Sequence, residues 1–271
     1  RARMSGNGYF NEARFFNTTL AFAQGGNDPA YLYDTPGNHT YTAWSDRVKM
    51  TSIGASHEAR GFGRTFGCAT SGEDEAFLYG TAGNDTFSAW WDHAAMFGTG
   101  YNNETMGFKS TTAYASEGVD QAFFYDSAGD DVYSAWADRA EMTGYGFLNT
   151  AIGFDETFAT ASVGDDLGNL YDSEGNDIYT AWWNRVRMTG NGYANEASGF
   201  ARTAAYATLG NDSATFYDST GDDIFSTWPD RATMQGPGFF NESQGFRSVI
   251  CQACAAFNKA RLFESQPHAT Y

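Results

Sequence analysis

Residues 214–228 read A-T-F-Y-D-S-T-G-D-D-I-F-S-T-W, and this stretch decides the fold. Phe216 and Tyr217 fall on opposite sides of an extended chain, because side chains alternate along a β-strand. The Gly221-Asp222 step is a turn signal, and a second apolar run follows it. The stretch therefore predicts a strand, a turn and a second strand.

The same pattern recurs with a period of 46 residues along the chain. An Arg-x-x-Met motif opens the blocks, with His93-x-x-Met96 as the variant. The blocks are 1–46, 47–92, 93–138, 139–184, 185–230 and 231–271, and the last is partial and divergent. Because no insertion or deletion breaks the period, residues 1–271 are predicted to form a single repeat array.

Two residue series mark the array most clearly. Tryptophan recurs as Trp44, Trp90, Trp136, Trp182 and Trp228. Asparagine recurs as Asn11, Asn103, Asn149, Asn195 and Asn241, with His57 as the exception. Such series are typical of stacked repeats, and the asparagine amides are expected to hydrogen-bond to the same amide in the next turn.

The repeat predicts an all-β fold, a parallel β-solenoid (β-helix) of six 46-residue repeats. Three strands of about 5–6 residues per coil would give about two coils per repeat and twelve coils in all. The alternative is a six-bladed β-propeller with one four-stranded blade per repeat. The constant repeat length favours the solenoid, because an insertion would break its ladders. A short terminal helix is expected within residues 249–263.

Composition excludes several classes of function. The formal net charge of −17 at pH 7 argues against nucleic-acid binding and against anionic membrane surfaces. No apolar run is long enough to span a membrane. Three cysteines do not make a disulfide framework, and Cys251 takes the repeat position of Ala21 and Ala113. The chain is expected to be a piece of a longer polypeptide.

The acidic turns resemble two groups of secreted proteins. The Gly-Asn-Asp and Gly-Asp-Asp turns beside Tyr-Asp-Ser loosely resemble the calcium-binding repeats of RTX-type proteins, although those repeat every nine residues. Residues 78–89 and 124–135 resemble more closely the L-Y-D-S-x-G-N-D-T-F-x-A units of very large secreted or surface repeat proteins of aquatic bacteria. This resemblance implies an extracellular or cell-surface location and a structural role.

Recurring aspartates are the candidate metal ligands. The predicted calcium ligands are Asp34, Asp85, Asp126, Asp131, Asp172, Asp177, Asp218 and Asp223. A further series is Asp28, Asp74, Asp120, Asp166 and Asp212, and His39 interrupts the series of Asp85. Stacked carboxylates repel one another unless a cation neutralises them, and Ca²⁺ takes six to eight oxygen ligands. The alternative is that each aspartate caps its own turn. No cofactor is required by the repeat, and Ca²⁺ is the candidate.

Outward-facing side chains suggest two further kinds of contact. Tyr33 and Tyr79 alternate with Leu32 and Leu78, so the tyrosines face outward if the leucines face inward. Such a row either packs against other parts of the protein or stacks on glycans. N-x-S/T sequons, which are candidate glycosylation sites, begin at Asn17, Asn38, Asn84, Asn103, Asn211 and Asn241.

The sequence is predicted to be a structural segment of an extracellular fibre or cell-surface stalk that associates with itself end to end. The alternative is a calcium-stiffened adhesin or a glycan-binding module. A polysaccharide lyase or epimerase is the third hypothesis. His39, His57, His93 and His268 fall at unrelated repeat positions, so no catalytic residue is predicted and the chain is not expected to be an enzyme.

Overall fold

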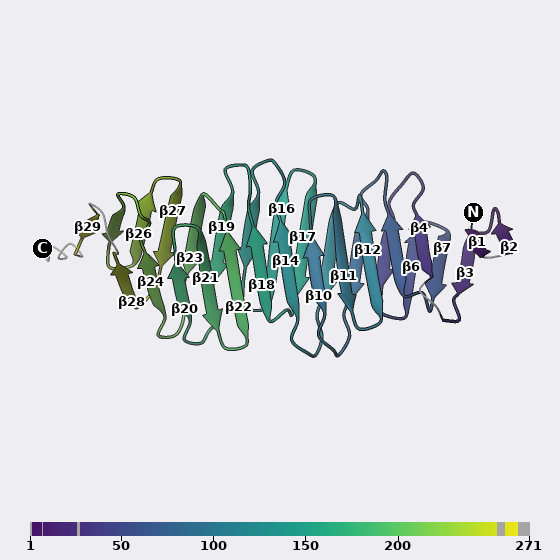
Figure 1. Cartoon of the computed structure of the whole chain (residues 1–271), viewed down its shortest axis with the longest axis horizontal. Helices are drawn as coiled ribbons and strands as arrows, with labels where there is room; N and C mark the ends of the chain where they lie inside the picture. The colour runs from purple at the N-terminus through teal and green to yellow at the C-terminus, as the bar shows by residue number, and fades with distance from the viewer. Residues whose placement is uncertain (1, 7, 26–27, 254–257, 265–271) are drawn as a thin grey trace, which may run out of the picture. The chain divides into compact units, whose positions relative to one another are not determined.

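Figure 1 shows the computed structural model of the chain, in which β-strands are joined by short turns. The structure describes residues 2–6, 8–25, 28–253 and 258–264. These residues form 29 strands and no helix. Accordingly, the described part of the chain has no helix with the length and apolar character needed to cross a membrane.

The chain divides into two compact units, and each is described by itself. Unit 1 comprises residues 1–122 and 146–153, and unit 2 comprises residues 123–145 and 154–271. Strand β14 (Gln121–Tyr125) contains a boundary between them. Unit 1 holds β1 (Ala2–Gly6), β2 (Tyr9–Ala13), β3 (Thr18–Phe22), β4 (Pro29–Tyr33), β5 (Thr40–Ala43), β6 (Arg47–Ser52), β7 (Ala55–Arg60), β8 (Arg64–Cys68), β9 (Glu75–Tyr79), β10 (Thr86–Ala89), β11 (His93–Gly98), β12 (Tyr101–Met106), β13 (Ser110–Tyr114) and β17 (Phe147–Ile152). Unit 2 holds β15 (Val132–Ala135), β16 (Arg139–Gly144), β18 (Glu156–Thr160), β19 (Leu167–Tyr171), β20 (Ile178–Ala181), β21 (Arg185–Gly190), β22 (Tyr193–Ser198), β23 (Arg202–Tyr206), β24 (Ser213–Tyr217), β25 (Ile224–Thr227), β26 (Arg231–Gly236), β27 (Phe239–Gln244), β28 (Ser248–Gln252) and β29 (Lys259–Leu262).

Unit 1 is built from two sheets and a separate hairpin. The strand orders are β17-β13-β9-β5-β6-β7-β3 in one sheet and β10-β11-β12-β8-β4 in the other. Strands β5, β6 and β7 form an antiparallel meander, whereas β9 and β13 join the same sheet by parallel pairing. The hairpin β1–β2 forms a two-stranded sheet of its own.

Unit 2 repeats this plan. Its strand orders are β29-β25-β26-β27-β23-β19-β15-β16 in one sheet and β28-β24-β20-β21-β22-β18 in the other. The meanders alternate between the sheets, because β20-β21-β22 lie in one and β25-β26-β27 in the other. Each parallel pair joins residues 35 or 38 positions apart, as Leu167 with Arg202 and Glu156 with Ala194.

The predicted parallel β-solenoid is confirmed, and the six-bladed propeller is wrong. Details of the coil differ from the prediction. The chain makes about seven turns rather than twelve, because each turn passes between two sheets rather than three and each repeat contains an antiparallel meander. Glycines with positive φ form the hairpin tips of the meanders, for example Gly192 with φ of 79°. The recurring glycine therefore marks a hairpin that the parallel pattern alone did not predict.

The core of each unit lies where strand residues alternate inward and outward. In β24, Ala214 and Phe216 are fully buried while the residues between them are partly exposed. Leu78 and Leu170 are also fully buried, which confirms that the leucine row faces inward. The terminal helix expected within residues 249–263 is wrong, because β28 and β29 occupy its described part.

Candidate functional site

Aspartates from two successive turns of the chain meet at each acidic turn. Two of them flank one turn between strands, and the third comes from the next turn of the solenoid. The groups, numbered here as acidic sites, are Asp34, His39 and Asp74 (first), Gly80, Asp85 and Asp120 (second), Asp126, Asp131 and Asp166 (third), Asp172, Asp177 and Asp212 (fourth), and Asp218, Asp223 and Asn258 (fifth). The recurrence of one geometry makes these sites the leading candidates for a common function.

The third and fourth acidic sites keep three carboxylates. In each, one oxygen from every carboxylate lies within 4.8 Å of the other two. Burial raises the pKa of Asp166 and of Asp212, and the neighbouring carboxylates, Asp126 and Asp131 for Asp166, raise it further. Three close acidic groups of this kind offer oxygen ligands that suit a cation such as Ca²⁺.

Each of the other acidic sites has lost one carboxylate. Histidine takes the second position of the first site, and glycine takes the first position of the second site. In the fifth site Asn258 replaces the third aspartate. Its Nδ2 donates to Asp218 Oδ2 at 2.6 Å, and its Oδ1 accepts from the Asp223 backbone N–H at 3.0 Å. The amide therefore keeps the acceptor role and turns a repulsive contact into a hydrogen bond.

Most carboxylates in these sites already accept hydrogen bonds. The Ser173 backbone N–H and hydroxyl donate to Asp177 Oδ2 at 3.0 and 2.9 Å, which is the predicted capping of its own turn. The Thr208 backbone N–H donates to Asp172 Oδ2 at 2.6 Å across one turn of the solenoid. The Asp177 backbone N–H donates to Asp212 Oδ1 at 2.8 Å. These bonds tie successive turns together whether or not a cation is bound.

A tyrosine hydroxyl completes the second and fourth sites and is missing from the other three. The Tyr193 hydroxyl donates to Asp177 Oδ1 at 2.8 Å, and Tyr101 bonds Asp85 in the same way. The residue at this repeat position after the third site is Phe147, which has no hydroxyl. Asp131 Oδ1 is buried and has no hydrogen-bond partner. The third site is therefore the acidic site with the least internal neutralisation.

The structure places the predicted metal ligands in different surroundings. Asp126 with Asp131, and Asp172 with Asp177, share sites with a third carboxylate. Asp218 and Asp223 share a site with an amide, Asp34 shares one with His39, and Asp85 has a glycine at the first position. The aspartates of the third position were not predicted as ligands. Their 46-residue spacing was visible, but only the 35-residue pairing step places them against the preceding turn.

The recurring asparagines lie in a buried hydrogen-bond chain rather than in an amide ladder. The Tyr133 hydroxyl bonds the Thr157 hydroxyl, which donates to Asn195 Oδ1 at 2.6 Å. Asn195 Nδ2 then donates to the Trp136 carbonyl at 2.8 Å. Tyr133 and Thr157 lie on β15 and β18, so the chain joins the two sheets of unit 2. The expected stacking of like amides is wrong, because threonine and a main-chain carbonyl satisfy each amide.

Equivalent chains recur along the array. Tyr41, Thr65 and Asn103 repeat the arrangement in unit 1, and Tyr179, Thr203 and Asn241 repeat it in unit 2. Burial raises the pKa of the tyrosine hydroxyls well above its usual range, so these hydroxyls stay protonated at neutral pH. The repeat therefore specifies a polar network as well as an apolar core.

Aromatic side chains form stacked columns on the outer faces. Trp136 stacks on Tyr171 with ring centroids 4.9 Å apart, and Tyr171 stacks on Tyr206 at 5.0 Å. The Arg139 guanidinium lies 4.4 Å from the Trp136 ring centroid. Unit 1 has the same column of Arg47, Trp44, Tyr79 and Tyr114. Because ring faces within a column cover one another, the tryptophan and tyrosine series connect successive turns.

The sequons divide into exposed and buried asparagines. Asn17, Asn38, Asn84 and Asn211 are exposed. Asn103 and Asn241 are 2% and 3% exposed, and their side chains are bonded within the buried chains described above. The burial of Asn103 and Asn241 makes them less accessible to a glycan in the folded protein than the four exposed asparagines, and all six sequons stay a prediction.

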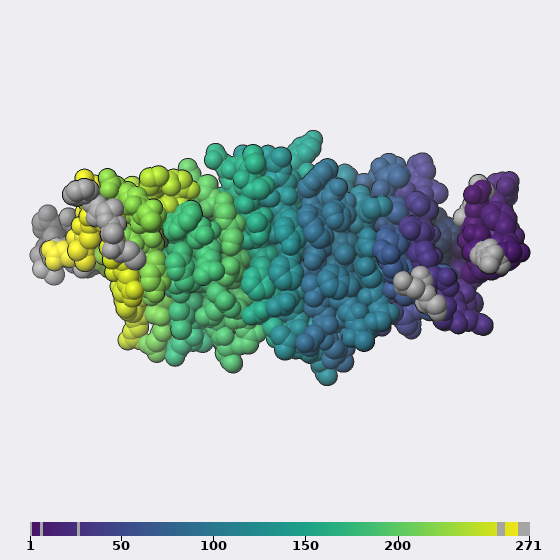
Figure 2. All heavy atoms as spheres, in the orientation of Figure 1, coloured from purple at the N-terminus to yellow at the C-terminus, as the bar shows by residue number. Residues whose placement is uncertain are grey.

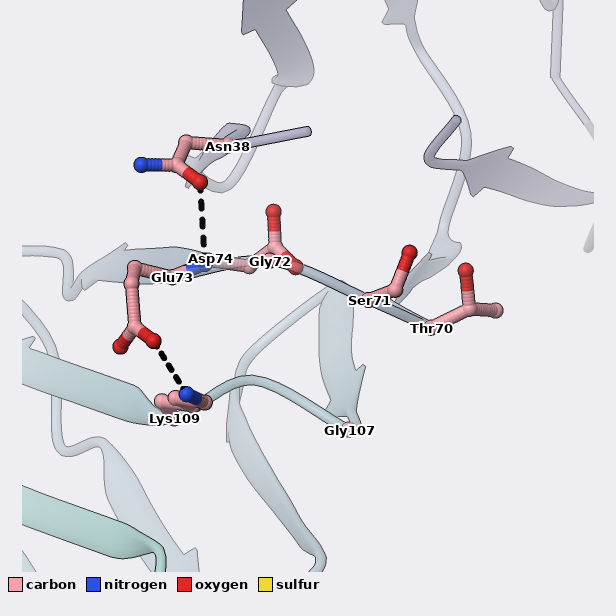
Figure 3. A pocket seen from close by; sticks show the side chains of 8 residues that line it. All are labelled: Asn38, Thr70, Ser71, Gly72, Glu73, Asp74, Gly107 and Lys109. Carbon is pink, nitrogen blue, oxygen red and sulfur yellow. Dashed lines mark hydrogen bonds and ion pairs between the residues drawn. The ribbon is translucent and has the colours of Figure 1, made fainter. Parts of the chain in front are cut away.

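Surface hollows in unit 1 are open and polar. Figure 3 shows a hollow of about 360 Å³ in which Asn38 accepts a hydrogen bond from the Glu73 backbone N–H and Glu73 pairs with Lys109. The Glu73 and Lys109 side chains are largely exposed. Over the strands of unit 2, the face drawn in Figure 2 is closely packed and shows no deep cleft. A small-molecule site is usually a largely enclosed, mostly apolar pocket, whereas this hollow is open to solvent and lined mainly by polar residues.

No family model, curated protein or solved structure matches the chain.

Proposed function

We propose that the chain is a structural segment of an extracellular fibre or cell-surface stalk. The observation that carries the proposal is the buried chain of tyrosine, threonine, asparagine and tryptophan carbonyl that recurs along the array, as in Tyr133, Thr157 and Asn195. The polar residues of this buried chain connect successive turns and do not form a surface site. The resemblance of residues 78–89 and 124–135 to secreted repeat proteins supports the extracellular location.

The aromatic columns support the same role more than they support glycan binding. A sugar stacks on the face of an aromatic ring, but the faces within each column are covered by the neighbouring ring or by an arginine. The carboxylates of the acidic sites likewise connect turns through backbone N–H groups. Enzyme activity receives no support from either feature, and we propose that the chain is not an enzyme.

The experiment that tests this function combines location with mechanics. Antibodies against the chain are expected to label fibres or stalks outside intact source cells in electron microscopy. In single-molecule pulling, the chain is expected to lengthen in discrete steps, because each repeat is held by its neighbours. The variant Asn195→Leu should lower the force of the steps in unit 2, since it leaves the Trp136 carbonyl without its amide. Label inside cells, or smooth extension without steps, would contradict the proposal.

A second candidate function is a calcium-stiffened adhesin, favoured by the third and fourth acidic sites. Calcium titration followed by calorimetry is expected to show binding that Asp166→Asn and Asp212→Asn together abolish. The matched control is Asp130→Asn, which removes an exposed carboxylate next to the third site. Unchanged heat in the double variant would reject these sites as the calcium ligands.

A further inference from the structure

The third and fourth acidic sites of unit 2 are built by the same parallel pairing of strands. Strand β15 pairs with β19, and the Asp131 backbone N–H donates to Asp166 at 2.9 Å. Strand β20 pairs with β24, and the Asp177 backbone N–H donates to Asp212 at 2.8 Å. In both sites one oxygen of each carboxylate lies within 4.8 Å of the other two. A difference in chemistry between the sites therefore comes from the groups that surround the carboxylates.

The first carboxylates of the two sites have matching hydrogen bonds. Asp126 accepts the backbone N–H and the hydroxyl of Ser162. Asp172 accepts the same two groups from Thr208. The third carboxylates also match, because each accepts one backbone N–H from the second position. These bonds do not distinguish the two sites.

The second carboxylate is where the two sites differ. Asp131 Oδ2 accepts the Ser127 backbone N–H and hydroxyl at 2.7 and 2.8 Å, and Asp177 Oδ2 accepts the same groups from Ser173. Asp177 Oδ1 also accepts the Tyr193 hydroxyl at 2.8 Å. Asp131 is 1% exposed, and its Oδ1 has no hydrogen-bond partner. One buried oxygen without a donor therefore separates the third site from the fourth.

The tyrosine hydroxyl neutralises part of the charge of the fourth site. Burial and the Asp177 carboxylate raise the pKa of Tyr193, so the hydroxyl stays protonated and donates. The fifth site has another neutral donor, the Asn258 amide, which donates to Asp218. A cation at the fourth site has to compete with the Tyr193 hydrogen bond for an oxygen of Asp177. At Asp131 Oδ1 of the third site no described residue competes in this way.

The unpaired oxygen of Asp131 gives the third site the chemistry of a cation ligand set. A buried anionic oxygen is costly unless a donor or a cation faces it, because burial removes its contact with water. Burial and the neighbouring carboxylates also raise the pKa of Asp166, so the third site carries a repulsion that a divalent cation relieves. Calcium takes six to eight oxygen ligands, and carboxylates of this kind are among them.

We infer that the third acidic site is the primary calcium site of unit 2 and that the Tyr193 hydroxyl makes the fourth site a weaker one. This inference rests on the calcium-binding function given above as the second candidate, and it adds an order of binding and the residue that sets it. Asp126, Asp131 and Asp166 supply carboxylate oxygens to the ion, and Asp131 Oδ1 is one of them. Tyr193 determines affinity at the fourth site by occupying an oxygen of Asp177.

Hydrogen exchange during a calcium titration measures the two sites separately in the intact chain. The protein is first freed of metal with EDTA, and calcium chloride is then added. Peptides covering residues 127–133 report the third site, and peptides covering residues 173–179 report the fourth. Half-maximal protection of the third site is expected at a calcium concentration about tenfold or more below that of the fourth, since a hydrogen bond to a charged group opposes binding there.

Two variants separate the roles of the two sites. Tyr193→Phe keeps the ring and removes the hydroxyl, so it should lower the calcium midpoint of the fourth site about tenfold and leave the third unchanged. Asp166→Asn should abolish protection of the third site only, while the amide oxygen still accepts the Asp131 backbone N–H. Thermal unfolding in EDTA checks that both variants are folded.

The matched control is Asp130→Asn. The Asp130 carboxylate is exposed and accepts the Asp165 backbone N–H at 2.9 Å, a bond that an amide oxygen can keep. Both calcium midpoints should therefore change by less than about twofold.

The outcomes distinguish the order of binding from calcium binding itself. Equal midpoints in the wild type, or a fourth-site midpoint that Tyr193→Phe leaves unchanged, would overturn the order while the calcium function stands. Protection of the third site that persists in Asp166→Asn would overturn its assignment as the primary site. Absence of protection at both sites would reject the calcium function together with this inference. Cell labelling would still judge the structural function separately.

Discussion

The first and third acidic sites are built on the same turn, but their charges are balanced in opposite ways. His39 in the first site stands where Asp131 stands in the third. Burial acts to raise the pKa of Asp34, but hydrogen bonds from Thr70 and Ser71 and the charge of His39 lower it overall. Burial and neighbouring carboxylates instead raise the pKa of Asp166 in the third site. The same backbone turn is therefore compatible with either arrangement of charged side chains.

Neighbouring repeat positions change together with the histidine. Ser52 and Ala55 take the positions that Gly190 and Tyr193 hold near the fourth site. A Cβ at Gly190 would overlap Asp177 Oδ1 and the Tyr193 ring, so the aspartate, glycine and tyrosine form one packing solution. A larger residue at position 39 is accompanied by a smaller one at position 55. We conclude that the turn accepts a different charge when three positions change as a set.

The largest expected effect comes from removing the carboxylate of the fourth site. Asp177→Ala leaves the buried Tyr193 hydroxyl and the Ser173 backbone N–H without an acceptor, which should destabilise this region by about 2–4 kcal/mol. Hydrogen exchange of peptides covering residues 171–193 measures the loss locally. Glu174→Ala, an exposed change in the same turn, is the control and should have little effect. Equal exchange in the two variants would contradict the role given to Asp177.

The sequence predicted the fold better than it predicted the site. The unbroken 46-residue period, together with rows such as Leu78 and Leu170, was enough for a stacked solenoid with an inward apolar face. The number of sheets and the antiparallel meanders were missed, because local alternation is the same for parallel and antiparallel strands. Gly192 and its equivalents carried the missing signal, since positive φ at a fixed position indicates a hairpin tip.

The acidic sites needed information that only pairing registers supply. Asp126 and Asp131 are close in sequence and were grouped correctly, but Asp166 joins them from the next turn. Asn195 was assigned to a structural ladder, and its partners Thr157 and Trp136 come from positions 38 and 59 residues earlier. Long-range contacts of this kind follow from register, and register depends on the whole sheet rather than on local sequence.

A charge change at the first site should sharpen the comparison. His39→Asp creates a third carboxylate beside Asp34 and Asp74 without the hydroxyl that the fourth site has, so unit 1 should lose about 1–2 kcal/mol at pH 7. The triple variant His39→Asp, Ser52→Gly and Ala55→Tyr should regain most of this loss, because the three changes restore the set found near the fourth site. Hydrogen exchange of residues 34–41 measures the loss of stability in the single variant and its recovery in the triple variant. Additive effects of the three substitutions would contradict the inference that these three positions change as a set.

A gain in stability is expected from Asp166→Asn. The fifth site already has this arrangement, in which Asn258 keeps the acceptor and donates to Asp218. The variant should stabilise the region around the third site by about 1 kcal/mol at neutral pH without calcium. Asp130→Asn, an exposed change, should stay within about 0.5 kcal/mol of the wild type. Destabilisation by Asp166→Asn in the absence of calcium would contradict the repulsion between carboxylates inferred for the third site.

The smallest expected effect is a pH dependence with opposite signs at the two kinds of site. The folded-state pKa values of Asp166 and Asp212 are raised above 3.8, so the folded state holds more protons than the unfolded state between 3.8 and the raised values. Their contribution to stability therefore increases as the pH falls through this window. The pKa of Asp34 is lowered, so its contribution is present above 3.8 and is lost as the pH falls towards its folded value. Thermal unfolding of the wild type minus that of the variant Asp166→Asn with Asp212→Asn isolates the first effect from pH 7 to pH 4. The difference should move in favour of the wild type as the pH falls, and a difference that is constant over this range would contradict the repulsion inferred for the third and fourth sites.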